Sequence, residues 1–91
     1  MHDTKVIFAY QVIPGTDEIL AFTESLASAQ QEASQHFVGL KAEDEKVDPG
    51  IAIYKVTLKN PDLSDYVNVL NHPEDARERL VGTIERVELI S

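Results

Sequence analysis

The chain has 91 residues, enough for one hydrophobic core and too few for a second, so we expect a single domain over residues 1–91. Its sixteen acidic and eight basic residues give a net charge of −8, which opposes direct binding to nucleic acid or to anionic membrane surfaces. The lack of cysteine excludes disulfides and thiolate catalysis. No apolar run has the length of a signal peptide or a membrane span, and we expect a cytoplasmic protein.

The first part of the chain predicts a β-hairpin. Residues 5–13 are apolar on both alternating faces, which indicates a central strand or a strand whose second face meets a partner. Residues 14–17, PGTD, predict a turn, because proline and glycine favour the two special backbone conformations that a turn needs. Residues 19–23 then predict a short strand that returns beside the first.

A one-sided helix is predicted over residues 25–40. Ser25 is placed to cap its first turn, and Gly39 is placed to end it. Its apolar residues recur at helical spacing on one stripe: Leu26, Ala29, Ala33, Phe37 and Leu40. Such a stripe has to be covered, so we expect this helix to lie on the sheet.

The next segments predict a loop and a strand. Residues 42–50 form the longest and most acidic loop, and residues 51–59 alternate in the manner of a strand. One face of this strand is apolar throughout and is called here the Tyr54 set: Ala52, Tyr54, Val56 and Leu58. We expect the Tyr54 set to lie under the helix and the face that carries Lys55 to point to solvent.

A second, short helix is predicted after this strand. Asn60, Pro61 and Asp62 form a helix-start signal, with Asn60 as the cap. Apolar residues then follow at i, i+3, i+4 and i+7: Leu63, Tyr66, Val67 and Leu70. A strand over residues 66–70 is the alternative, ranked lower because its two valines would face together with no polar pattern behind them.

The chain closes with a third helix and a strand, which together complete the fold prediction. Pro73 starts a helix over residues 73–81 and Gly82 ends it, while residues 83–90 mix charged and apolar side chains on both faces, as an edge strand does. The order is β-β-α-β-α-α-β. We therefore expect an α+β two-layer sandwich, with a mostly antiparallel sheet of three to four strands and one main helix packed on one face.

Motifs for catalysis, cofactors and metals are weak. The sequence has no Gly-x-Ser-x-Gly motif and no glycine-rich phosphate loop, so we expect no enzyme activity and no cofactor. Glu32 and His36 are spaced to share a metal on a helix, but no further ligand joins them, and a solvated contact is favoured. The acidic run that begins at Glu43 lacks the spacing of a calcium loop, so no metal site is expected there either.

Acidity is the strongest pointer to function. Residues 1–50 hold nine acidic and three basic residues, so a partner that recognises charge would meet this half. The candidate partner-binding residues are Glu32, Glu43, Asp44, Glu45 and Asp48. They could present carboxylates where phosphates would sit on a basic partner; the alternative is a solvated loop that only keeps the protein soluble.

Two function hypotheses follow. In size, acidity and lack of catalytic motifs the chain resembles small phage-encoded inhibitors of host defence, such as anti-CRISPR or DNA-mimic proteins. The resemblance is one of bulk character and transfers no site residue. It implies a non-catalytic binding protein that occupies the surface of another protein, for instance the basic site of a nucleic-acid-binding one. The alternative is a homodimeric structural or small-ligand-binding module, in which a second copy covers the free face of the first strand.

Overall fold

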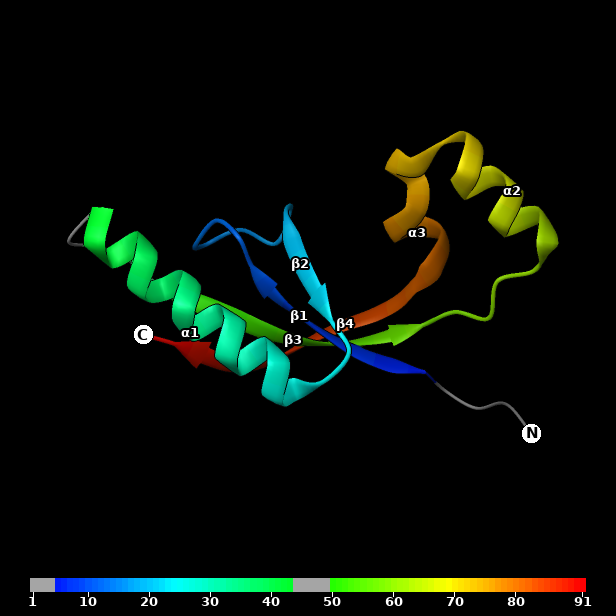
Figure 1. The fold of residues 1–91 in the computed structure, drawn as a ribbon. Helices are drawn as coiled ribbons and strands as arrows, with labels where there is room; N and C mark the ends of the chain where they lie inside the picture. Colours follow the sequence, from blue (N-terminus) through cyan, green and yellow to red (C-terminus); the bar gives the residue numbers. More distant parts are fainter. Residues whose placement is uncertain (1–4, 44–49) are drawn as a thin grey trace.

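A computed structural model describes residues 5–43 and 50–91 (Figure 1). The elements in chain order are β1 (Val6–Gln11), β2 (Leu20–Thr23), α1 (Leu26–Glu43), β3 (Ile51–Leu58), α2 (Leu63–Asn71), the 3-10 turn η1 (Pro73–Asp75), α3 (Ala76–Leu80) and β4 (Val81–Ile90). The four strands form one antiparallel sheet, and α1 packs on one of its faces. This confirms the predicted α+β class and the order β-β-α-β-α-α-β.

Strand β1 lies inside the sheet, whose strand order is β2-β1-β3-β4. Phe8, for example, pairs with Thr23 of β2 on one side and with Lys55 of β3 on the other. The prediction of a central strand is therefore correct, and it explains why both faces of β1 are apolar. A strand with neighbours on both sides exposes no backbone edge, and both of its faces can be covered.

Helix α1 packs on the sheet through two alanines. Ala29 and Ala33 are fully buried against Ile51 and Ile53, and partly buried apolar side chains surround this cluster. Small side chains on the helix allow its backbone to approach the β-branched isoleucines closely. The prediction that the Tyr54 set lies under the helix is thus wrong: the face with Ile51 and Ile53 does. The face that carries Lys55 was predicted to point to solvent, and within β3 only Lys55 itself is exposed there.

The second face of the sheet carries the Tyr54 set and is covered by a short helix from the same chain. An apolar pocket of about 370 Å³ has Ile7, Phe22 and Leu58 of this face on one side and Ala76 and Leu80 of α3 on the other. Helix α3 therefore lies over this face, at the opposite side of the sheet from α1 (Figure 1).

A buried glutamine completes the hydrogen bonding of the central strands. Gln11, the last residue of β1, is 5% exposed, and its side-chain oxygen accepts a hydrogen bond of 2.8 Å from the Ala52 N–H. Its amide nitrogen donates to the Tyr54 hydroxyl at 3.2 Å. The β1–β3 ladder ends at Tyr10, so this side chain replaces the missing backbone partner.

A register shift in the β3–β4 ladder places two isoleucines of β4 on different faces of the sheet. Ile84 pairs with Val56 on the second face, whereas Ile90 pairs with Ile51 on the α1 face. Regular alternation would place these two isoleucines on one face, but the register shifts between Ile53 and Tyr54. Each isoleucine thereby reaches a different side of the sheet. The prediction of mixed faces missed this shift.

Three predicted boundaries differ from the structure. Gly39 does not end α1, which continues to Glu43, and Gly82 lies inside β4 instead of stopping a helix. The third helix divides into η1 and α3. Glycine needs a positive φ to act as a stop, and in the described residues that conformation occurs at Gly15 and Gly50. The Ser25 cap is confirmed, because its hydroxyl accepts a hydrogen bond of 3.1 Å from the Ser28 N–H.

Candidate protein-binding surface

Helix α2 begins at a well-formed cap. The Asp62 carboxylate accepts a hydrogen bond of 2.9 Å from the Asp65 N–H, and the Asp65 carboxylate accepts one of 3.0 Å from the Asp62 N–H. This reciprocal capping box makes Asp62 the cap, two residues beyond the predicted Asn60, and α2 begins at Leu63. Arg79 of α3 lies 3.5 Å from the Asp65 carboxylate and connects the two helices.

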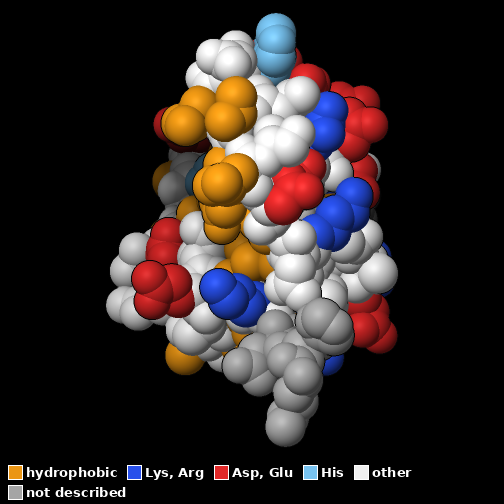
Figure 2. All heavy atoms as spheres, turned by 90° about the vertical axis from the view of Figure 1, so that its right-hand side faces the viewer, with side chains coloured by type: hydrophobic (Ala, Val, Ile, Leu, Met, Phe, Trp, Pro, Cys, Tyr) orange, Lys and Arg blue, Asp and Glu red, His pale blue; other side chains and the backbone are white. Residues whose placement is uncertain are grey.

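The apolar stripe of α2 points to solvent. Leu63 is 82% exposed and Leu70 80%, while Tyr66 and Val67 are 52% and 57% exposed. Figure 2 views this end of the molecule and shows hydrophobic side chains gathered in its upper half, beside acidic and basic ones. We call these four residues the α2 apolar face. The α2 apolar face is the candidate binding surface, because contiguous exposed apolar side chains are uncommon on small domains.

The side of α2 that turns toward the rest of the molecule is the more polar one. Asp65, Asn68 and Val69 are partly buried, and α2 packs against η1 and α3. Asp65 meets Arg79, and Asn68 Oδ1 is buried with no hydrogen-bond partner among the described residues. Surface helices normally bury their apolar stripe and expose the polar one. In α2 the polar side is partly buried and the apolar side is exposed. Packing within the described chain therefore does not explain the apolar residues of α2.

The acidic residues predicted to bind a partner lie elsewhere or outside the described chain. Glu32 is exposed on the middle of α1, and Glu43 is exposed as its last residue. Eleven residues of helix separate the two along about 16 Å, so the structure does not bring them together. Asp44, Glu45 and Asp48 lie outside the described residues. Helix α1 and helix α2 lie at different ends of the molecule (Figure 1).

Glu32 does have a neighbour on the sheet. Burial, and after it the Glu32 carboxylate, raises the pKa of Tyr10 above its ordinary value. His36, one turn further along α1, lies over the same tyrosine with ring centroids 6.1 Å apart. Its Nε2 is 2.7 Å from the Val12 carbonyl oxygen, to which it donates in the tautomer protonated at Nε2. These contacts of His36 help to hold α1 against β1.

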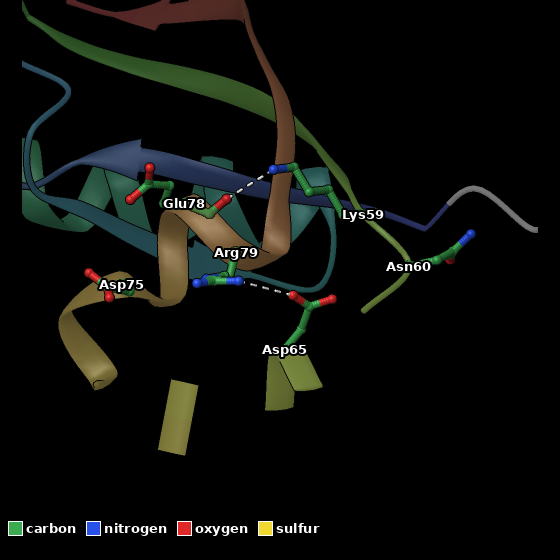
Figure 3. A pocket seen from close by; sticks show the side chains of 6 residues that line it. All are labelled: Lys59, Asn60, Asp65, Asp75, Glu78 and Arg79. Carbon is green, nitrogen blue, oxygen red and sulfur yellow. Dashed lines mark hydrogen bonds and ion pairs between the residues drawn. The ribbon is translucent and has the colours of Figure 1, made fainter. Parts of the chain in front are cut away.

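A polar pocket of about 360 Å³ lies between α2, α3 and the end of β3 (Figure 3). Lys59 Nζ donates to the Glu78 backbone oxygen at 3.0 Å, and Arg79 points to Asp65. Asp75 also lines the pocket. Its basic groups are already engaged with oxygen atoms of the same chain. These two contacts therefore connect α2 to α3 and α3 to the end of β3.

Two further findings concern other kinds of site. Within residues 5–43 and 50–91, no three side chains of His, Cys, Asp or Glu gather as a metal site would require. No helix in the same part of the chain combines the length and the apolar character needed to cross a membrane.

The Asp65 carboxylate is expected to make stability depend on pH. Its hydrogen bond from the Asp62 N–H, supported by Arg79, holds the pKa of Asp65 below the ordinary value of 3.8. A lowered pKa in the folded state stabilises the protein above the unfolded value, and this contribution is lost as the pH falls through the folded pKa. Asp65→Asn should therefore destabilise the protein at neutral pH, and the difference from wild type should shrink below about pH 4.

Urea unfolding of both proteins between about pH 7 and about pH 3 measures this difference. Asp75→Asn removes one negative charge from the neighbouring η1 and controls for net charge. A difference between wild type and Asp65→Asn that stays constant over this range would contradict a stabilising role for the carboxylate.

No protein-family model, curated protein or solved structure matches this chain. The candidate surface consequently rests on the geometry of α2. Sequence reasoning identified the four apolar residues from their spacing but took them only as a sign of helix. Asp65 and Asn68 lie opposite this stripe, as polar residues do on any amphipathic helix, so the sequence held no signal that α2 exposes its apolar residues.

Proposed function

We propose that this chain is a non-catalytic binding protein that acts by occupying a surface of a partner protein. The observation that carries the proposal is the α2 apolar face, which the fold displays instead of burying. Leu63 and Leu70, the most exposed of the four residues, each forgo roughly 1.5–3 kcal/mol of burial energy. A capping box and the Arg79 contact nevertheless hold α2 in this orientation. A partner that covers the face would recover the burial energy.

The acidity of the chain supports a basic partner. A net charge of −8 accelerates encounter with a positively charged surface and repels nucleic acid. More specifically, we propose that the partner is a nucleic-acid-binding protein. This chain would block its basic site, as phage-encoded inhibitors of host defence do. Glu32 and Glu43, which lie exposed on α1, would then contribute to attraction at a distance from the α2 contact.

The experiment is affinity capture from extracts of the cells that carry the gene, with wild type and with the double variant Leu63→Ser/Leu70→Ser as bait. Central apolar anchors of an interface contribute about 2 kcal/mol or more each, so the double variant should bind the captured protein several hundred-fold (about 700-fold) more weakly. Val38→Ser, which alters an exposed apolar residue of α1, is the matched control and should bind as wild type does.

Equal retention by wild type and by the double variant would rule out the α2 apolar face as the contact. The proposal that the chain blocks a nucleic-acid-binding site is tested by adding the chain to the captured protein bound to labelled nucleic acid. Release of the nucleic acid is expected, and a stable ternary complex would contradict a blocking mechanism.

A further inference from the structure

We infer that α2 inserts as a helix into an apolar groove of the partner whose rim carries lysine and arginine side chains. This inference rests on the proposed function and adds the shape and charge of the partner's site. It is argued from the position of α2, from the spacing of its apolar residues and from the charges that surround them.

Position makes α2 accessible from several sides. The described chain measures 46 × 29 × 16 Å, and α2 lies at one end of it, away from α1 (Figure 1). Its contacts to η1 and α3 involve the side that carries Asp65 and Asn68. The side that carries the α2 apolar face stays exposed among the described residues, with a shallow hollow beside Leu63 and Val67.

The spacing of the apolar residues of α2 indicates how the helix contacts its partner. Leu63, Tyr66, Val67 and Leu70 occupy positions i, i+3, i+4 and i+7, the anchors with which an amphipathic helix binds a hydrophobic groove. All four are exposed at the same time, which is what such binding needs. Tyr66 adds a hydroxyl that can reach the polar edge of a groove while its ring stays in the apolar part.

The charges of residues 60–80 indicate the charge expected on the rim of the partner's groove. Residues 60–80 contain five acidic residues and the two arginines Arg77 and Arg79. Both arginines are engaged within the chain: Arg77 Nη1 donates to the Asp17 backbone oxygen at 2.5 Å, and Arg79 contacts Asp65. Asp62, directly before α2, and Glu74 and Glu78, in the segment that follows it, remain exposed. The segment that carries the apolar face is therefore negatively charged, and a complementary rim on the partner is positive.

A second copy of this chain fits the face less well. Two α2 helices brought together would place the same excess of acidic residues on both sides of the contact. Like charges that face each other across a contact weaken it, so a partner with basic residues fits the face better than a second copy does.

The test places a photoreactive benzoylphenylalanine at Tyr66 and, as a control, at Val38 of α1, each in the full chain. After capture and irradiation, mass spectrometry identifies the crosslinked peptide of the partner. From Tyr66 the crosslink is expected at apolar residues flanked by Lys or Arg, and from Val38 no crosslink to this segment is expected. The affinity of the purified pair should fall at least about tenfold between 50 and 500 mM salt.

Crosslinks from Tyr66 to a second copy of the chain, or to a partner segment without Lys or Arg, would overturn the inference. An affinity that does not change with salt would also overturn it. These outcomes leave the proposed function intact as long as Leu63→Ser/Leu70→Ser still abolishes capture. Capture that survives the double variant, by contrast, rules out the α2 apolar face as the contact and removes the observation on which the proposed function rests.

Discussion

Gly50→Ala is expected to lower the free energy of unfolding by about 2–5 kcal/mol. Gly50 is buried directly before β3 and has a φ of +109°, a conformation that side chains other than glycine rarely adopt. A Cβ at this position would also collide with the backbone oxygen of Ile90, at the end of β4. Backbone strain and this clash act together, because β4 is held by its ladder to β3 and cannot withdraw easily.

Urea unfolding followed by circular dichroism measures this loss, and Gly39→Ala is its matched control. Gly39 lies inside α1 with no atom within 4 Å of the position its Cβ would take. Alanine is the better helix former, so this change should stabilise the protein by about 0.5–1 kcal/mol. Effects of the same sign at both glycines would contradict the backbone conformations described for them.

Ile53→Ala is expected to destabilise the protein by about 2–5 kcal/mol. Ile53 is fully buried between β1 and α1, where it contacts the cluster formed with Ala29 and Ala33. The two alanines are already small, so the space left by the isoleucine cannot be filled by a neighbouring side chain. A domain of this size has about 5–14 kcal/mol of stability, and the variant should lose a large part of it.

The control removes a similar side chain from the α2 apolar face. Leu63→Ala should change stability by no more than about 0.5 kcal/mol, because Leu63 is exposed. Urea midpoints of the two variants give the comparison. A loss at Leu63 as large as that at Ile53 would show that α2 is packed against the body of the protein, which would remove the basis for a binding role.

The sequence allowed the fold class to be predicted because its apolar periodicity is local. Alternation over β1 and β3 and the single stripe of α1 each specify an element without reference to the others. The choice of the β3 face under α1 was not predictable in this way. Both faces of β3 are apolar near Ile53, and the decision depends on where α3 lies, which is a matter of tertiary structure.

The candidate surface was less predictable than the fold. The spacing of Leu63 and Leu70 indicates a helix but not the direction in which its apolar stripe points. That direction depends on the Asp65–Arg79 contact, which joins residues fourteen positions apart. The acidic residues gave a different candidate: Glu32 and Glu43 are exposed but far apart on α1, and their binding role stays a prediction.

The contact at the base of the β3–β4 connection has a consequence for how such a protein can diversify. Lys59 N donates to Leu80 O at 2.8 Å, so the connection leaves the sheet and returns to it at one place. Within the segment that connects β3 to β4, helix α2 contributes no fully buried side chain to the core. Substitutions on its outer side therefore escape the selection that preserves folding, and new binding specificities can be sampled there while the sheet and α1 stay unchanged.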